Sequence, residues 1–220
     1  MASIPVPGQL PSSDDFAWRA IGVCERLGSA VMLAGCSPIL GVSAVAVSLL
    51  SGRTPFIAHK RVGWRGATLW MLKLRTMWGS HSGVGRRRTR WVEYIDDETG
   101  PARKQARDPR VPSWFARFCR RHSIDELPQL WHVIKGEMAL VGPRPLTPWE
   151  LRQHYGTDGR AVFEAKPGLA GLWQVSGRNR LSYAERRELD LEFVRRRSLR
   201  LYFRILLRTV PEILSGSDSW

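Results

Sequence analysis

Two adjacent carboxylates, Asp125 and Glu126, lie in the part of the chain that is richest in chemically useful side chains. Positive charge lies on both sides of the pair, from Arg120 before it and from Arg144 after it. A carboxylate that attacks a phosphate must overcome the repulsion between two negative groups, and arginines or a divalent metal ion can neutralise that repulsion. The segment therefore has the residue types that phosphoryl transfer requires.

The same residues also fit an ordinary helix start. Ser123-x-x-Glu126 has the spacing of a capping box, and acidic residues in the first turn complement the helix dipole. Pro128 agrees with this interpretation, because proline is tolerated near a helix start. Spacing alone leaves open whether the carboxylates are catalytic or only cap a helix.

A longer stretch of sequence resembles the signature of one protein family. After Arg120 come Asp-Glu-Leu-Pro-Gln at 125–129, Gly-Glu-Met at 136–138 and Leu-Val-Gly-Pro-Arg-Pro at 140–145. This order is similar to that of the bacterial sugar transferases, specifically the monotopic phosphoglycosyl transferases that act on polyprenol phosphate. The resemblance also includes residues 73–77, 108–111 and 166–178, so it covers about residues 20–212.

The resemblance implies a reaction and a set of site residues. A hexose-1-phosphate would pass from a UDP-sugar to undecaprenyl phosphate with release of UMP, as the first membrane step of exopolysaccharide or glycoconjugate synthesis. Asp125 would attack and form a phosphosugar-enzyme intermediate, and Asp125 and Glu126 would hold Mg²⁺. The sequence of residues 171–178 is most similar to that of family members that use a hexose, which favours galactose or glucose over an acetamido sugar. Contacts to substrate phosphates are expected from Arg120, Arg144, Lys73 and Arg75, and other substrate contacts from Gln174 and Arg178.

An uncharged run precedes these motifs. The segment from Leu27 to Gly52 contains no charged residue, and it is long enough for a helix that spans a bilayer. Ser37-Pro38 lies near its middle, where proline interrupts the backbone hydrogen bonds and Ser37 can satisfy a freed carbonyl. Positive residues flank both ends, which disfavours moving either end across the membrane. The family resemblance implies a re-entrant helix-break-helix with its break at Ser37-Pro38, and a kinked span is the alternative.

We expect a mostly helical α+β fold, with the re-entrant hairpin followed by a cytosolic globular domain. The expected division is a disordered tail over 1–18, the membrane hairpin over 19–53 and the catalytic domain over 54–220. Residues 56–77 predict a small β-hairpin around a turn at 63–66. Residues 79–107 predict a solvated loop.

Two further segments carry both arginines and aromatic side chains. Residues 111–122 and 182–214 are amphipathic and basic, which predicts helices at the membrane interface. An ordinary amphipathic helix is an equal alternative for residues 111–122. The family commonly has Ser-Leu-x-x-Asp where this chain reads Ser198-Leu199-Arg200-Leu201-Tyr202. Because that acid is missing, no catalytic role is predicted for this end. A non-catalytic, membrane-associated scaffold of the same fold is the alternative function.

The charge balance restricts the partners. A net charge of +14 and a pI near 10.9 predict anionic partners, such as lipid head groups or a phosphorylated substrate. Zinc-finger spacing and RNP-like aromatic patterns are missing from the sequence, so a nucleic-acid partner is not expected. Three cysteines without metal spacing fit a reducing cytosol. The expected location is the inner leaflet of the bacterial cytoplasmic membrane, with UDP-sugar, undecaprenyl phosphate and lipids as partners. The sequence leaves a homo-oligomer open.

Overall fold

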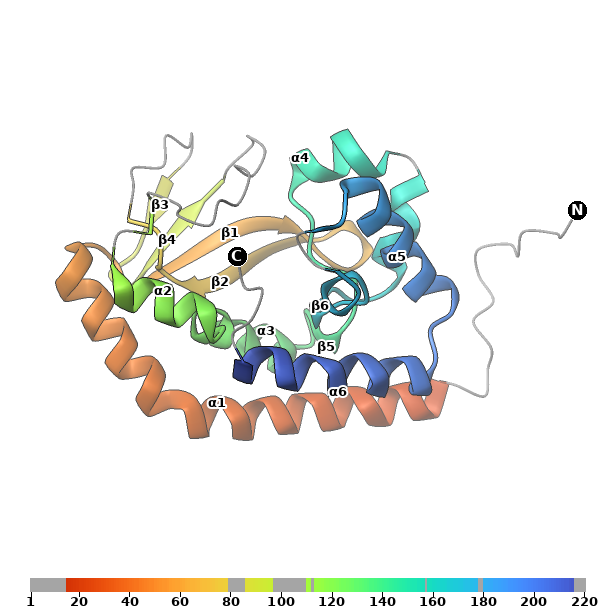
Figure 1. Ribbon diagram of the computed structural model, residues 1–220, viewed down its shortest axis with the longest axis horizontal. Coiled ribbons are helices and arrows are strands. Elements are labelled where there is room, and N and C mark those ends of the chain that lie inside the picture. The colour runs from red at the N-terminus through yellow and green to blue at the C-terminus, as the bar shows by residue number, and fades with distance from the viewer. Residues whose placement is uncertain are drawn as a thin grey trace, which may run out of the picture.

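The computed structural model describes residues 15–78, 86–96, 110–111, 113–156, 158–177 and 180–215. One long helix lies along an edge of a body that contains a four-stranded sheet, a two-stranded sheet and short helices (Figure 1). The prediction of a mostly helical α+β fold is confirmed. The predicted tail lies largely outside the described residues, and the first helix begins at Asp15.

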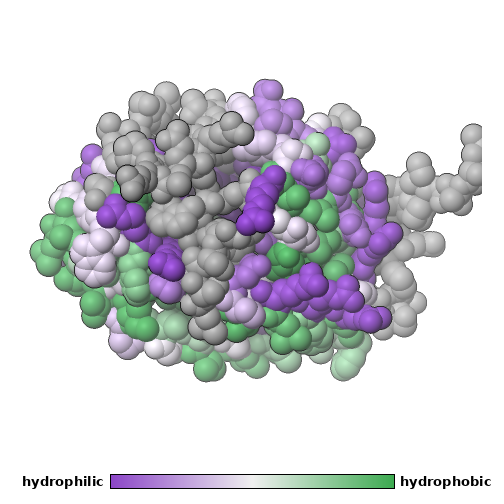
Figure 2. Space-filling model, in the orientation of Figure 1, coloured by the Kyte–Doolittle hydropathy of each residue, from purple (hydrophilic) through white to green (hydrophobic). Residues whose placement is uncertain are grey.

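Helix α1 (Asp15–Ser51) carries the uncharged run. By length and composition it can cross a membrane: its most apolar window has a mean hydropathy of 2.0, and only 11% of that window is buried. Large apolar side chains are exposed along its whole length, and Figure 2 shows hydrophobic residues along this edge of the molecule. An apolar surface of this extent marks an interaction site. The exposed residues are Phe16, Val23, Leu27, Val31, Met32, Ile39, Val42, Val45, Leu49 and Leu50.

The Ser37-Pro38 pair lies inside α1 and does not end it. Pro38 has no N–H to donate to the carbonyl of Ala34, and the Ser37 hydroxyl donates to that carbonyl instead at 2.7 Å. Figure 1 shows that α1 is bent, with one part beside α6 and the other running towards β3 and β4. An internal proline is a common cause of such a bend. Insertion of this bent helix into one leaflet stays a prediction.

The predicted hairpin is present. Strands β1 (Phe56–Val62) and β2 (Thr68–Leu74) are antiparallel, with Phe56 opposite Leu74 and Val62 opposite Thr68. The turn between them contains a short 3-10 helix, η1 (Trp64–Gly66), in which Arg65 and Gly66 have positive φ angles of 54° and 78°. This turn carries the chain directly back along β1.

Two more strands extend the sheet where a loop was expected. Strand β4 (Val92–Ile95) runs parallel to β1 on its other side, and β3 (Arg86–Arg88) pairs with β4. The prediction of a loop over 79–107 is therefore wrong for these residues. Strand β3 consists of three arginines, and charged residues are typical of an edge strand that must not pair further.

A second, two-stranded sheet brings two glycines into contact. Strands β5 (Ala139–Val141) and β6 (Gly168–Ala170) are parallel. A Cβ atom on Gly168 would collide with the backbone nitrogen of Gly142, and a Cβ on Gly142 with the carbonyl of Lys166. The two backbones thus approach closely at these glycines, and this contact fixes the start of the segment Pro143-Arg144-Pro145.

Replacing Gly168 by alanine is expected to destabilise the fold by about 1–3 kcal/mol, because the colliding atoms belong to backbone and cannot rotate away. Thermal unfolding of the detergent-solubilised protein measures the effect. Gly28→Ala in α1 is the control, since a Cβ there meets nothing within 4 Å. Equal unfolding temperatures for the two variants would contradict the proposed contact.

Short helices connect the two sheets and close the fold. The predicted interfacial stretch 182–214 is two helices, α5 and α6, and only α6 lies beside α1 in Figure 1. Phe193 of α5 and Ile205 of α6 pack with Val141 and Ala170, so both helices cover the small sheet. The helices after the hairpin are α2 (Trp114–Arg121), the 3-10 helix η2 (Ile124–Gln129), α3 (Leu130–Lys135), α4 (Pro148–Glu150), η3 (Leu151–Tyr155), η4 (Asp158–Glu164), η5 (Trp173–Val175), α5 (Tyr183–Arg195) and α6 (Leu199–Ser215).

Candidate active site

The two carboxylates lie on η2, between α2 and α3. Asp125 is 7% exposed, and Glu126 accepts a hydrogen bond from the Lys73 ammonium at 2.8 Å. Strand β2 packs against η2, and this contact brings Lys73 to the carboxylates from 53 residues earlier in the chain. The structure therefore brings together three of the residues that the sequence singled out.

A helix does begin here, with both carboxylates in the first turn of η2, but the predicted capping box does not form. Ser123 has a φ angle of 55°, in the left-handed region, and within the described part of the chain its side chain accepts no capping hydrogen bond. The Glu126 side chain bonds Lys73 instead of reaching back to Ser123. The Glu126 side chain is thus used for an ion pair with β2 and not for a capping box.

The inner face of α2 lies next to Asp125. Cys119 is fully buried, and burial together with the nearby Asp125 carboxylate raises the pKa of the Cys119 thiol to about 11. The thiol is therefore protonated at neutral pH and does not compete with Asp125 as a nucleophile. Val47 of α1 lies in the same buried cluster as Cys119, so the second part of α1 packs against the helix beside the site.

Arg120 supplies a buried donor at the end of α2. Its Nε atom is buried and donates to none of the residues that the structure describes. An unpaired buried donor costs free energy unless a ligand accepts its hydrogen bond, and the helix that carries it packs on η2. These features are consistent with the predicted contact between Arg120 and a substrate phosphate.

Arg75 is committed to a different place. Its side chain is fully buried, with Nη2 donating to Glu93 at 2.7 Å and Nε donating to the carbonyl of Thr54 at 2.7 Å. Burial lowers the pKa of Arg75, and the ion pair with Glu93 opposes that shift. Strand β2 ends at Leu74, so strand alternation does not fix the direction of the next side chain. Arg75 thus ties the segment between α1 and β1 to β4, and its predicted phosphate contact gains no support here.

Arg144 belongs to a second group of residues, around Trp173. Its guanidinium carbon is 5.8 Å from the centre of the Trp173 ring, and that of Arg186 is 4.8 Å from the same centre. Gln174 follows Trp173 on η5, so this cluster joins two of the predicted substrate contacts. Arg178 lies outside the described residues.

Asp190 is a buried acid that the sequence analysis missed. It is fully buried on α5, accepts a hydrogen bond from the Tyr155 hydroxyl at 2.8 Å and lies close to the backbone and charge of Arg144. Burial raises the pKa of Asp190 to about 7, although Tyr155 and Arg144 oppose the shift. The available signal was an acid between Leu189 and Leu191, but only the fold shows that it faces inward.

Stability is expected to fall as the pH rises from about 4 to about 7, because folded Asp190 holds a proton that the unfolded chain has already released. Above pH 7 this loss is complete. Asp190→Asn should remove this part of the pH dependence, as followed by unfolding temperature against pH. Exposed Glu188→Gln on the same helix is the control, and identical slopes for all three proteins would contradict the assignment.

His132 connects the hairpin to α3, the helix that follows the carboxylate pair Asp125 and Glu126 (the dyad). Its Nε2 accepts from the backbone N–H of Leu72 at 3.2 Å, so the ring proton is on Nδ1, facing Glu137 at 2.6 Å. Burial alone would raise the pKa of Glu137, but hydrogen bonds from Lys135 and His132 lower it overall. These bonds give His132 a structural role, because they hold α3 against the strand that carries Lys73.

Tyr202, which replaces the acid that the family commonly carries, contacts an acidic residue of α1, Glu25. The Tyr202 hydroxyl donates to Glu25 Oε1 at 2.8 Å, and the same oxygen accepts from the backbone N–H of Leu140 at 2.7 Å. Tyr202 is 4% exposed. Glu25 thus joins α1 to α6 and to β5. Its contact in β5, Leu140, lies two residues before Gly142.

Comparison with known proteins places the chain in a family. The sequence profile described as bacterial sugar transferase matches residues 17–216. The chain therefore belongs to the bacterial sugar transferase family, and it is an enzyme of that class.

Individual relatives agree with this assignment. The exopolysaccharide production protein ExoY of Rhizobium meliloti is 37% identical over 89% of this chain and 86% of its own length. A UDP-galactose-lipid carrier transferase of Erwinia amylovora is 41% identical over 77% of this chain and 35% of its own length. A UDP-glucose:undecaprenyl-phosphate glucose-1-phosphate transferase of Caulobacter vibrioides is 33% identical over 90% of this chain and 71% of its own length.

Proposed function

We propose that this protein transfers a hexose-1-phosphate from a UDP-sugar to undecaprenyl phosphate and releases UMP. The observation that carries the proposal is the low exposure of Asp125 beside the Glu126–Lys73 ion pair. The names of the Erwinia and Caulobacter relatives support galactose or glucose as the sugar and a lipid phosphate as the acceptor. Exopolysaccharide synthesis is the pathway favoured by the name of the Rhizobium relative.

Asp125 is the proposed nucleophile. One of its carboxylate oxygens attacks the phosphorus that bears the sugar, the bond from that phosphorus to the bridging oxygen breaks, and UMP leaves. An oxygen of undecaprenyl phosphate then attacks the same phosphorus, and the bond to Asp125 breaks. The low exposure of Asp125 supports this role, because a carboxylate with little hydration is a better nucleophile and water is kept from the intermediate.

The surrounding charges would hold the diphosphate. Lys73, Arg120 and Arg144 are the proposed contacts, and the unsatisfied Nε of Arg120 supports its part in this set. Within the described ranges, His, Cys, Asp and Glu side chains form no group of three or more that could hold a metal. Mg²⁺ needs only one or two carboxylates when substrate phosphates complete its shell, so Asp125 and Glu126 suit it as ligands. When bound, the ion neutralises diphosphate charge.

The exposed apolar surface supports a place on the cytoplasmic face of the bacterial inner membrane. Trp114 and Phe118 of α2 are 71% and 44% exposed, and α6 also exposes Phe203 and Leu207. With α1, these helices give the protein an apolar side that water disfavours and lipid accepts. We propose that α1 enters one leaflet and returns, which puts a soluble nucleotide-sugar and a lipid phosphate at one site.

Release of UMP from a panel of UDP-sugars tests the proposal, with detergent-solubilised protein, undecaprenyl phosphate and Mg²⁺. Release from UDP-galactose or UDP-glucose is expected, with dependence on the lipid. Removing the metal with EDTA should stop the reaction, and adding Mg²⁺ back should restore it. If a folded protein, shown by cooperative unfolding, releases no UMP from any UDP-sugar of the panel, a non-catalytic scaffold is favoured instead.

A further inference from the structure

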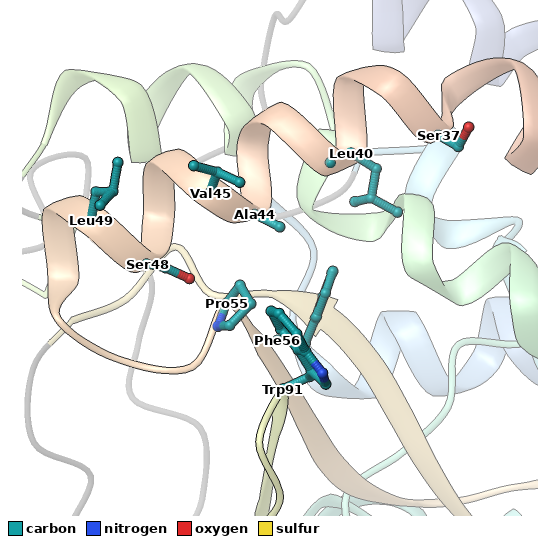
Figure 3. Close-up of a pocket in the computed structure, with 10 residues that line it drawn as sticks. Ser37, Leu40, Ala44, Val45, Ser48, Leu49, Pro55, Phe56 and Trp91 are labelled. Carbon is teal, nitrogen blue, oxygen red and sulfur yellow. The ribbon is translucent and has the colours of Figure 1, made fainter.

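A cavity of about 480 Å³ lies between the second part of α1 and the beginning of β1. Seven of its ten lining residues come from α1 between Ser37 and Leu49, and Pro55, Phe56 and Trp91 face them across the space (Figure 3). None of the ten is charged, and two serines are the only polar side chains among them. A nucleotide, sugar or ion would lose its hydration there without replacement, so the cavity suits a hydrocarbon.

The lining is also elongated. The α1 residues run from 37 to 49, which corresponds to about 18 Å along the helix axis at about 1.5 Å per residue. A slot of this form accommodates a linear apolar chain better than a compact ligand. Because α1 is the helix that is long and apolar enough to cross a membrane, a lipid can reach the slot without leaving an apolar environment.

We propose that this cavity binds the isoprenyl units next to the phosphate of the polyprenyl-phosphate acceptor. The proposal rests on the proposed function and adds a binding site for the lipid tail. The polar end of such a ligand must reach Asp125, and the packing places the cavity near the helix that carries this residue. Ala44 and Phe56, which line the cavity, pack against the buried cluster that contains Cys119, and Ile124 packs against the same cluster.

These contacts connect the slot to the nucleophile. Ile124 directly precedes Asp125 in η2, and Cys119 is close enough to the Asp125 carboxylate to feel its charge. Val47 of α1 lies in the same buried cluster as Cys119, and Ala44 packs against it. A chain held along this part of α1 therefore lies beside the part of the fold that carries Asp125 and Glu126. An acyl chain of a membrane phospholipid also fits an apolar slot, but nothing brings its head group to Asp125.

A glycine in the lining allows the slot to be filled without touching the dyad. Gly41 lines the cavity, and a Cβ there would meet nothing within 4 Å, so Gly41→Leu places a side chain in open space. Gly35→Leu is the matched control, because Gly35 lies in the same helix with equally open surroundings and does not line the cavity. Both changes increase helix propensity, so both variants are expected to fold.

The test uses a polyprenyl phosphate with a photoreactive group in the isoprene unit nearest the phosphate, mixed with protein in phospholipid nanodiscs. Irradiation of the wild type is expected to label peptides that contain residues 37–49 or Trp91. Gly41→Leu should lower that labelling by about ten-fold, since several buried carbons lose their contact, while Gly35→Leu leaves it unchanged. The excess phospholipid of the nanodisc competes with the probe for the cavity. Labelling of other peptides without labelling of residues 37–49 or Trp91 would overturn the proposal.

Kinetics separate this site from the reaction itself. Gly41→Leu should raise the KM for undecaprenyl phosphate by about ten-fold and leave acceptor-independent exchange of labelled UMP into the UDP-sugar unchanged. Labelling of the slot in a wild-type protein that releases no UMP would support the tail site and reject the proposed function. Equal KM values for Gly41→Leu and Gly35→Leu, in a protein that does release UMP, would reject the tail site alone.

Discussion

Asp125→Asn is expected to lower kcat for UMP release by at least about 10³-fold, because an amide cannot form the proposed bond to phosphorus. Asparagine has the same number of heavy atoms as aspartate, so it fits the nearly buried site and the fold should be retained. Initial rates with UDP-galactose or UDP-glucose, undecaprenyl phosphate and Mg²⁺ measure the loss.

Two controls show whether the effect belongs to the nucleophile. Glu126→Gln removes the charge that pairs with Lys73 and should reduce the rate less, since the nucleophile remains. Exposed Glu188→Gln should leave the rate unchanged. A rate for Asp125→Asn that equals the rate for Glu188→Gln would mean that the covalent mechanism is wrong, even if the reaction itself is right.

Glu25→Ala is expected to cost about 3 kcal/mol of stability, because it leaves two donors without their acceptor, the Tyr202 hydroxyl and the Leu140 N–H. Glu25→Gln keeps a side-chain oxygen at the same place and should cost much less. Thermal unfolding in one detergent compares the two variants. Equal losses for alanine and glutamine would show that these hydrogen bonds do not hold α1 against β5 and α6.

The tyrosine at 202 gives a second test of the same contact. Tyr202→Asp restores the residue that the family commonly carries, yet it should destabilise this chain, since the new carboxylate would face Glu25 and like charges repel. Combining it with Glu25→Gln should recover part of the loss. A stable Tyr202→Asp single variant would show that Glu25 does not replace the family acid.

Local patterns in the sequence predicted the features that depend on neighbouring residues. The hairpin follows from two extended segments around Gly63 to Gly66, and the role of the Ser37 hydroxyl follows from the proline after it. The segment that holds Asp125 and Glu126 came from the family signature, because spacing alone fitted a capping box equally well. The structure excluded that capping box through Ser123, whose backbone conformation no sequence pattern reveals.

Long-range pairing is what the sequence could not provide. Glu25 and Tyr202 are 177 residues apart, and Asp190 and Tyr155 are 35 apart, so no periodicity connects them. Strand β3 consists of three arginines, a sequence that predicts a solvated loop. Its strand conformation depends on pairing with β4, which the local sequence does not reveal. Lys73 and Arg75 were both expected to contact substrate phosphates, but Lys73 pairs with Glu126 and Arg75 is buried with Glu93.

The most direct test of the central claim is the intact mass of the protein after incubation with a UDP-sugar and Mg²⁺ but no lipid acceptor. The account predicts a covalent adduct of one hexose phosphate, located on the peptide that contains Asp125 and lost when undecaprenyl phosphate is added. Asp125→Asn should show no adduct. An active enzyme that gives no adduct, or one whose adduct lies on another residue, would contradict Asp125 as the nucleophile.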